Sequence, residues 1–238
     1  MLEAYILCNN EEKLMPYIMR HYTQFAKVII LESNSTDRTV EIAHSMGAEI
    51  WSYDVKDEID DRWFTDLKNN CWKESKADWV MIADADEFIY HPEIVKILQK
   101  NHNTIIQPKF YNMYSEQFPT TGGQIYEEVN RGVEQFSPKA KMNIFKPRAI
   151  KEMGYFPGCH EAFPVGVTRI DIDSPIKTLH MRNLSKEFII ERNLRARRRN
   201  SEQNRLNGWG CHVDWPEDEW IRRYEEGLKE ATEIICKL

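Results

Sequence analysis

The sequence of 238 residues has no apolar run approaching the roughly 20 residues that a membrane-spanning helix requires. Its first residues, MLEAYILCNNEE, lack the basic region and the small-residue cleavage site of a secretory signal. These absences argue against a membrane protein and against a secreted one. We therefore expect a soluble protein with no membrane span and a cytoplasmic location.

Cysteine is sparse and scattered, and no two cysteines form a C-x-x-C pair. An odd number of widely spaced cysteines suits reduced thiols better than a disulfide framework, and it excludes an obvious zinc site. The five are Cys8, Cys71, Cys159, Cys211 and Cys236.

The chain has no overall excess of positive charge, because its formal net charge is -6. A local basic patch can still occur inside an acidic total. With 42% hydrophobic and 29% charged residues, neither disorder nor a coiled coil is indicated. The length suits one α/β domain, and the sequence does not indicate the oligomeric state.

The first half of the chain alternates short apolar runs with amphipathic stretches, which predicts a parallel sheet with helical connections. The predicted strands cover residues 4–8, 27–32, 48–54 and 79–84, and the predicted helices cover 11–25, 37–47 and 62–75.

The second half is less regular. It predicts a helix over 91–100, strands over 103–110 and 139–150, loops over 111–136 and 154–166, and a basic helical segment over 185–205. The last segment, 214–238, predicts an amphipathic helix with Asp214 as N-cap and Pro216 in its first turn.

Three carboxylates interrupt the apolar run WVMIADADEFIY at residues 79–90, namely Asp84, Asp86 and Glu87. Asp84 and Asp86 share a face only on an extended strand, because a helix would separate them by about 200°. Two such charges about 6.5 Å apart repel by roughly 2.5 kcal/mol at an effective dielectric constant of about 20. We therefore expect a cation beside them.

A divalent metal ion is one candidate for that cation. Carboxylate oxygens favour Mg²⁺ or Mn²⁺, and an ion held by one or two carboxylates generally completes its shell with substrate phosphates. Ligands also collect beyond the carboxyl ends of parallel strands, where Asp84 and Asp86 are predicted to lie. The alternative is a strand-end turn with solvated acids.

Several segments in order resemble glycosyltransferase family 2, whose members have the GT-A fold and use nucleotide sugars. They are NNEE after the first strand, NSTD at 34–37, and ADWVMIADADEF, with weaker similarity through PGCHEA and IKTLHMRNLS to about residue 200. The resemblance implies a Rossmann-like α/β fold with a mostly parallel central sheet flanked by helices.

The resemblance also implies a domain organisation. We expect a catalytic domain over 1–183, with a nucleotide-sugar-binding half at 1–110 and an acceptor-side half at 111–183. The C-terminal helices of 184–238 are expected to pack on the same domain.

The metal site implied by the resemblance contains Asp84, Asp86 and His180 and binds Mn²⁺ or Mg²⁺. Asp86 matches the second acid of the family D-x-D and would hold the ion, whereas Asp84 matches the first acid, which contacts the ribose or the metal. His180 would complete the shell, and imidazole is a better ligand for Mn²⁺ than for Mg²⁺. The alternative for His180 is a structural role at a strand end.

The resemblance implies a set of residues that bind the donor, which we expect to be a UDP-sugar. Glu32 stands where the family usually has an Asp that reads the base, so the identity of the base stays open. Residues 34–37 are equally suited to a helix N-cap, and Arg182 to a surface ion pair instead of contact with the leaving diphosphate. The implied set is Asn10, Glu11, Glu32, Asn34, Asp37, Lys68, Asp84, Asp86 and Arg182.

Family 2 chemistry inverts the anomeric centre and needs a carboxylate base on the acceptor side. Glu161, in GCHEAF beside His160, is the first candidate. Glu127 and Glu128 are reserve candidates, whereas Asp171 and Asp173 are more typical of strand-edge acids.

The segment 186–205 carries seven basic residues against three acidic ones, a local excess of four positive charges. Arginines spread around a helix usually mean a solvated surface, and the alternative is a surface that binds a polyanion such as an acidic glycan or DNA. Trp209 and Trp215 follow, where an aromatic ring could stack on a sugar or base, although core packing suits Trp215 better.

The resemblance implies a metal-dependent glycosyltransferase whose acceptor is a cell-surface glycan precursor or hydroxymethylated pyrimidine in viral DNA. A metal-dependent phosphohydrolase is one alternative, but its D-x-D-x-[TV] loop needs Thr or Val where Phe88 stands. A non-catalytic nucleic-acid-binding module is the other, and it leaves the three carboxylates unexplained.

Overall fold

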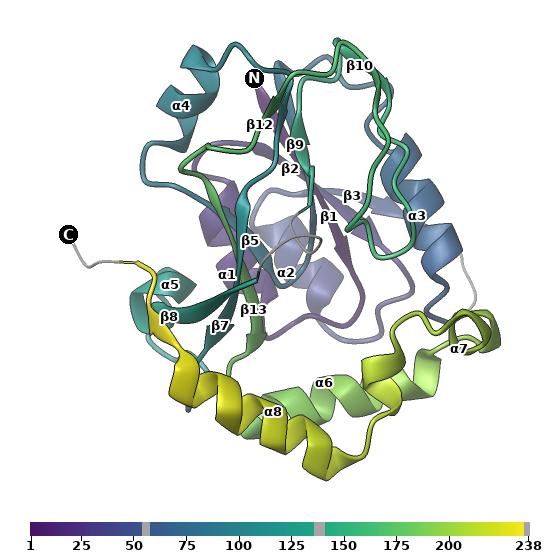
Figure 1. Cartoon of the computed structure of the whole chain (residues 1–238), viewed down its shortest axis with the longest axis vertical. Coiled ribbons are helices and arrows are strands. Elements are labelled where there is room, and N and C mark those ends of the chain that lie inside the picture. The colour runs from purple at the N-terminus through teal and green to yellow at the C-terminus, as the bar shows by residue number, and fades with distance from the viewer. Residues whose placement is uncertain (54–57, 136–140, 236–238) are drawn as a thin grey trace.

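The computed structural model describes residues 1–53, 58–135 and 141–235. Its largest sheet has the strand order β12-β6-β9-β4-β1-β2-β3, in which β9 runs antiparallel to both neighbours and the other pairs are parallel (Figure 1). The α/β architecture with a mostly parallel sheet is therefore confirmed. The strands are β1 (Leu2–Cys8), β2 (Lys27–Glu32), β3 (Glu49–Ser52), β4 (Trp79–Asp84), β6 (Ile105–Ile106), β9 (Ile144–Phe145) and β12 (Ile170–Asp171).

The central strands are apolar on both faces because both faces are covered. Ala4 and Ile6 of β1 pack in one core with α1 (Met15–Tyr22) and α2 (Thr39–Ser45). Tyr5, which points to the opposite face, packs in a second core with α3 (Asp61–Asn70). The alternation follows from the two-residue period of a strand.

A second sheet has the order β14-β8-β7-β13-β5. Strand β5 follows β4 after the two-residue turn Ala85-Asp86, so the carboxylates lie where the chain passes from one sheet to the other. Strand β13 pairs antiparallel with β5 and parallel with β7, which sets His180 opposite Glu87 on one side and Asn112 on the other. The strands are β5 (Glu87–Tyr90), β7 (Lys109–Tyr114), β8 (Arg131–Gln135), β13 (Lys177–Asn183) and β14 (Thr232–Glu233).

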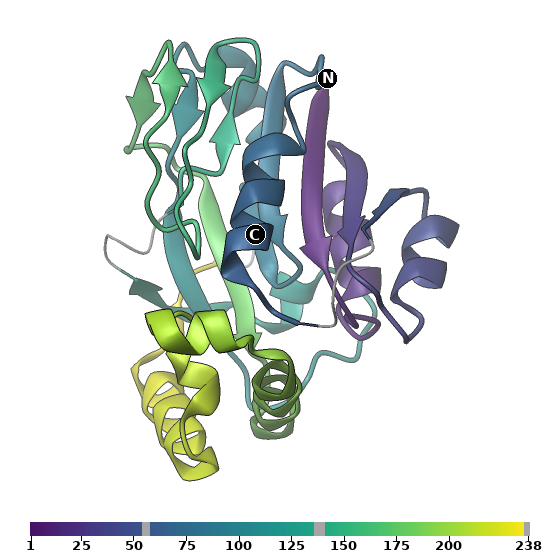
Figure 2. The same cartoon turned by 90° about the vertical axis from the view of Figure 1, so that its right-hand side faces the viewer.

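The C-terminal helices lie across one end of the two sheets (Figures 1 and 2). Helix α6 (Lys186–Arg199) packs on β13, and α8 (Glu217–Glu230) packs on α6, β7 and β8. Between them come α7 (Glu202–Asn207) and the 3₁₀ helix η1 (Cys211–Asp214). The remaining elements are α4 (Ile94–Lys100), α5 (Ile125–Glu128) and the antiparallel ribbon of β10 (Ile150–Glu152) and β11 (Val165–Gly166).

Several predicted elements of the second half were wrong. The strand predicted over 103–110 is divided between β6 and β7, which belong to different sheets, because Pro108 lacks the N–H that a continuous strand would donate. The loop predicted over 111–136 contains part of β7, α5 and β8, with residue 136 outside the described part of the chain. Of the strand predicted over 139–150, residues 139 and 140 lie outside the described residues, and among the rest only β9 and the first residue of β10 are extended strands.

The ends of the last helix also differ from the prediction. Pro216, not Asp214, occupies the N-cap position of α8, and Asp214 instead accepts hydrogen bonds from Asn200 and Arg205. The helix ends at Glu230, after which β14 forms; residues 236–238, with Cys236, lie outside the described residues.

The domain boundaries stay predictions. The two sheets do not divide at residue 110. Strand β5, which precedes this residue, belongs to the second sheet, whereas β9 and β12, which follow it, belong to the first. Within the described residues no helix is long and apolar enough to span a membrane, and the cytoplasmic location stays a prediction.

Candidate functional site

A cavity of about 910 Å³ opens beyond the carboxyl ends of β1 and β4, where β13, α6 and α8 also contribute residues to its wall. Its position agrees with the rule that ligands bind beyond the carboxyl ends of strands in open α/β sheets. Among its titratable lining residues are Glu11, Asp84, Asp86, His180, Arg182 and Arg192.

The turn between β4 and β5 places Asp84 and Asp86 differently from the prediction. They do not share one face of an extended strand, because β4 ends at Asp84 and Asp86 lies in the turn. The backbone of the turn is fixed on two sides. The Ala85 N–H donates to the Leu7 carbonyl at 3.1 Å, and the Asp86 carbonyl accepts from the Met181 N–H at 2.7 Å.

Two buried lysines neutralise Asp84 and Glu87. Lys68 Nζ lies 2.5 Å from one Asp84 carboxylate oxygen, and Lys141 Nζ lies 2.8 Å from the other and 2.6 Å from Glu87 Oε1. Burial alone would raise the pKa of Asp84, but the two lysines outweigh it and hold that pKa well below its usual range. The cation expected beside the acids is therefore supplied in part by the protein itself.

Asp86 has different partners. His180 Nδ1 lies 2.8 Å from the amide oxygen of Asn112, and His180 Nε2 lies 3.0 Å from Asp86 Oδ2. Because an amide oxygen only accepts, Nδ1 carries the hydrogen and Nε2 faces a carboxylate oxygen. Metal-binding imidazoles commonly donate their other N–H to such an oxygen.

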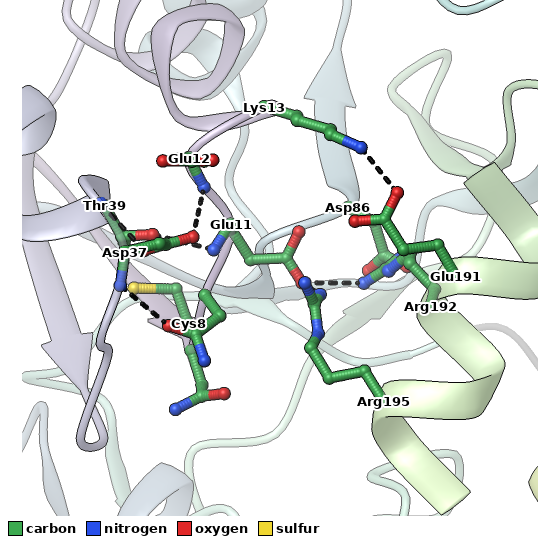
Figure 3. A network of polar contacts seen from close by, with 12 residues as sticks. Cys8, Glu11, Glu12, Lys13, Asp37, Thr39, Asp86, Glu191, Arg192 and Arg195 are labelled. Atoms are coloured by element: carbon green, nitrogen blue, oxygen red, sulfur yellow. Dashed lines mark hydrogen bonds and ion pairs between the residues drawn. The ribbon is translucent and has the colours of Figure 1, made fainter.

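Arginines of α6 complete the charge network at Asp86. Arg192 Nη1 donates to Asp86 Oδ2 at 2.6 Å, and its Nη2 donates to Glu11 Oε1 at 3.1 Å. Arg195 donates to the same Glu11 oxygen at 3.0 Å (Figure 3). Burial alone would raise the pKa of Asp86, but the Arg192 guanidinium together with His180 outweighs it and holds that pKa well below its usual range.

The expectation that the arginines of this segment form a solvated surface was wrong for most of α6. Arg192, Arg195 and Arg199 line the cavity, and Arg199 donates to Asn9 Oδ1 at 2.5 Å. Arg197 donates to backbone carbonyls of the η1 region, while Arg198 is exposed. The cavity thus has a basic wall.

Arg182 lines the cavity and forms no ion pair with any carboxylate of the described residues. Its guanidinium donates to Asn193 Oδ1 at 2.6 Å. Burial, together with the like charge of Arg192, lowers the pKa of Arg182 to about 10. An arginine in this state favours an anionic ligand.

Hydrogen bonds join the loop after β1 to the loop after β2, and they involve residues that were predicted to bind the donor. The Asn10 side-chain oxygen accepts from the backbone N–H groups of Thr36 and Asp37, at 2.7 and 3.2 Å. Asp37 in turn accepts from the N–H groups of Glu12 and Thr39, at 3.1 and 2.9 Å. The N-cap residue of α2 is Arg38, so none of residues 34–37 occupies that position, although Asp37 accepts from the N–H of Thr39, the first helical residue.

Glu32 and Asn34 shape the second of these loops. The buried Glu32 carboxylate accepts from the Ser35 N–H, and Asn34 adopts a left-handed conformation with φ of 55°. Neither residue lines the cavity, and the same holds for Asn10 and Asp37. Lys68 instead lines an adjoining cavity of about 110 Å³, together with Asp84.

The acceptor-side acids are less centrally placed. Glu161 is exposed and absent from the cavity lining, although its loop contributes Pro157 and His160. Glu127 closes the capping box of α5, and Glu128 accepts from two backbone N–H groups, so both reserve candidates have structural partners.

Sequence reasoning missed four residues that the structure brings to the site. They are Lys141, Arg192 as a partner of Asp86, and two acids of α8 that line the cavity, Glu226 and Glu230.

The side chains at Asp86 fit a divalent metal ion. No group of three His, Cys, Asp or Glu suited to hold a metal occurs among residues 1–53, 58–135 and 141–235. The separation of 3.0 Å between Asp86 Oδ2 and His180 Nε2 equals that of two neighbouring ligands about 2.1 Å from an octahedral ion. Two protein ligands and phosphate oxygens would satisfy Mn²⁺ or Mg²⁺, whereas both oxygens of Asp84 already contact lysines.

Residues 6–161, more than half of the chain, match the family model described as Glycosyl transferase family 2. The chain belongs to this family. The resemblance is therefore confirmed, and the mostly parallel α/β sheet agrees with the GT-A fold of that family. The family match favours a glycosyltransferase domain over the alternatives of a phosphohydrolase and a nucleic-acid-binding module.

Solved structures similar to this glycosyltransferase are distant from it. Glucosyl-3-phosphoglycerate synthase from Mycobacterium tuberculosis, in complex with Mn²⁺, UDP and phosphoglyceric acid, is 18% identical with a TM-score of 0.35, over 46% of this chain and 43% of that one. S. aureus TarS 1–349 is 12% identical with a TM-score of 0.47, over 82% of this chain and 64% of that one. The glycosyltransferase thus spans less than two thirds of either chain.

Proposed function

We propose that this family 2 glycosyltransferase transfers a sugar from a UDP-sugar to an acceptor hydroxyl, with inversion at the anomeric carbon, and that it requires Mn²⁺ or Mg²⁺. The observation that carries the proposal is the arrangement at Asp86. Its carboxylate and His180 Nε2 converge on one position at the cavity wall, with Arg182 nearby and without a carboxylate partner among the described residues.

Asp86 and His180 would hold the metal ion. When bound, the ion would act as a Lewis acid that neutralises the charge developing on the departing diphosphate. Asn112 fixes the tautomer of His180, so the ring presents Nε2 toward Asp86. Asp84, whose oxygens contact Lys68 and Lys141, is assigned to the donor ribose, the other role implied for this acid.

The basic wall of the cavity would bind the diphosphate. Arg182 supplies a guanidinium that is not already paired with a carboxylate of the described chain, and guanidinium groups bind phosphate with two parallel hydrogen bonds. Cations placed before the reaction stabilise the leaving group without reorganisation at the moment of bond breaking.

The loops after β1 and β2 would form the nucleotide end of the site. Asn10 and Asp37 hold the two loops together, which keeps Glu11 at the cavity wall. We assign base recognition to the loop that contains Glu32 and Asn34, because this loop reaches the cavity through Ser33, and we place Lys68 beside the ribose through Asp84.

The transfer itself forms one bond and breaks another. The acceptor oxygen bonds to the anomeric carbon, the bond from that carbon to the diphosphate oxygen breaks, and the hydroxyl proton passes to a carboxylate base. We assign the base to Glu161, whose loop reaches the cavity through Pro157 and His160.

Changing Glu161 to Gln should lower kcat by about 10²-fold to 10⁴-fold while the affinity for UDP and Mn²⁺ stays the same, because the change removes only the proton acceptor. The measurement is UDP release with a UDP-sugar. Glu152→Gln, an exposed acid on the same ribbon, is the matched control. Full activity of Glu161→Gln would transfer the assignment to a cavity acid such as Glu226.

A cell-surface glycan precursor is the acceptor we propose. Most arginines of α6 line the cavity or contact backbone, so they do not present a continuous basic face to a duplex. Mass spectrometry after incubation with glycan precursors, and separately with DNA containing hydroxymethylated pyrimidine, distinguishes the two acceptors.

Donor binding is tested by thermal unfolding. With Mn²⁺ present and UDP at about 100 times its Kd, the protein should be stabilised by about 2.7 kcal/mol, which raises Tm by roughly 5–10 °C. Asp86→Asn should abolish the rise, whereas Asp173→Asn, which changes an exposed acid, should keep it. Equal stabilisation by UDP with and without a divalent ion would refute the metal requirement.

A further inference from the structure

One oxygen of Asp86 has two partners in this structure. Asp86 Oδ2 accepts from Arg192 Nη1 at 2.6 Å and lies 3.0 Å from His180 Nε2. The oxygen that fits a metal ion together with His180 is therefore already bound to the guanidinium of α6. An ion at that position and Arg192 at its present distance would bring two cations against one carboxylate oxygen.

Arg192 is held in this position by its surroundings. Its second nitrogen donates to Glu11 Oε1 at 3.1 Å, an oxygen that also accepts from Arg195, and its guanidinium lies 5.6 Å from the centre of the Phe188 ring. The side chains of Asp86 and Glu11 are only 7% and 9% exposed. Such a bridge between two buried acids is unlike the mobile ion pairs of a protein surface.

We propose that Arg192 is an exchangeable internal cation: it neutralises Asp86 until the metal ion arrives with the nucleotide, and it then leaves Asp86 and binds the diphosphate. The inference rests on the proposed function, because it assigns the metal to Asp86. Glu11 keeps hold of Arg192 through Nη2 in both states, so the exchange requires only a short movement of the guanidinium.

The exchange makes metal and nucleotide cooperative. A metal ion alone must displace Arg192 from Asp86 while no anion receives the released guanidinium. A metal ion that arrives with UDP brings the diphosphate, which provides the anion. Each ligand therefore increases the affinity for the other, and by linkage the two increases are equal.

The experiment measures Mn²⁺ binding without nucleotide, from the EPR signal of free Mn²⁺. In Arg192→Met, Asp86 has no internal cation, so Mn²⁺ alone should bind about tenfold more tightly than in the wild type. Addition of UDP should then increase Mn²⁺ affinity by a smaller factor than in the wild type. Arg198→Met, which changes the exposed arginine of the same helix, should bind Mn²⁺ as the wild type does.

Circular dichroism would show whether Arg192→Met folds. If it does not, a second variant, Arg192→Lys, still tests the proposal. In Arg192→Lys the charge remains but one ammonium group cannot bridge Glu11 and Asp86 as the two nitrogens of Arg192 do, so Mn²⁺ alone should again bind more tightly than in the wild type. Unchanged or weaker binding of Mn²⁺ in the folded variants, with a wild type that binds Mn²⁺ and UDP together, would overturn the exchange and leave the proposed function intact. A wild type that binds no Mn²⁺ even with UDP would overturn both.

Discussion

His21 is a buried titratable residue that does not line the cavity. Its Nε2 lies 3.0 Å from the Ile89 carbonyl, and Nδ1 has no hydrogen-bond partner in the described part of the chain. Aromatic rings surround it, among them Tyr22 and Phe88. Burial lowers the pKa of His21 to about 4, so the folded protein holds this imidazole neutral.

The stability of the protein should fall in mild acid because of His21. The unfolded chain takes up the proton near the ordinary pKa of about 6.5, whereas the folded chain does so only near pH 4. Between these values the unfolded state binds more protons, so stability decreases as the pH falls. We expect His21 to contribute a loss of about 2 kcal/mol between pH 7.5 and pH 5, measured by urea unfolding.

His21→Phe should remove that part of the pH dependence, although the variant also loses the hydrogen bond to Ile89. His102→Gln, which changes an exposed histidine, serves as the control and should keep the wild-type pH dependence. Identical pH dependence in the wild type and His21→Phe would show that His21 is not held neutral by burial.

Single residues of the site differed in how well the sequence could predict them. The three carboxylates lie within four positions, and the cation expected beside them is present as Lys68 and Lys141, although Asp84 and Asp86 do not share a strand face as predicted. Lys141, which supplies part of that charge, lies 57 residues from Asp84, and no local pattern joins the two. Arg192 lies in a visible basic segment, but the direction in which α6 turns its arginines depends on tertiary packing.

Helix α8 approaches the second sheet very closely at one glycine. A Cβ atom added to Gly227 would lie 2.2 Å from the Tyr114 hydroxyl oxygen, so any larger side chain must displace the Tyr114 ring or move α8 away from β7. We expect Gly227→Ala to destabilise the protein by about 1–3 kcal/mol in urea unfolding, despite the higher helix propensity of alanine.

Lys229→Ala is the matched control for this helix, since Lys229 is exposed two residues further on. Its stability should stay within about 0.5 kcal/mol of the wild type. A Gly227→Ala protein as stable as this control would contradict the close contact between α8 and β7.

Strands were predictable from the sequence where the side chains on both of their faces are buried. Strands β1, β2 and β4 are buried on both faces, so they appear in the sequence as short apolar runs between helices. Strand β8, RGVEQ, is largely polar and only partly buried, and it was assigned to a loop. It forms a strand because it pairs with β7 in the folded protein. Its sequence shows no alternation of apolar residues from which this pairing could be predicted.

The whole molecule places its site where two sheets meet. The turn between β4 and β5 carries Asp86 to the junction, β13 brings His180 to it, and α6 closes it with Arg192. The turn lies about a hundred residues before the other two segments, because Asp86 is 94 residues from His180 and 106 residues from Arg192. Strand β13 and helix α6 follow each other directly in the sequence. The resemblance to the family predicted the roles of Asp86 and His180, whereas the role of Arg192 became evident only from the structure.

The central claim is that Asp86 and His180 hold one divalent ion together with the donor diphosphate. Pulsed EPR on the complex with Mn²⁺ and UDP tests it directly, because an imidazole nitrogen bound to Mn²⁺ produces a characteristic nuclear modulation. We expect this nitrogen modulation in the wild type and its loss in His180→Gln. A wild-type complex that binds Mn²⁺ and UDP without any nitrogen modulation would contradict the account.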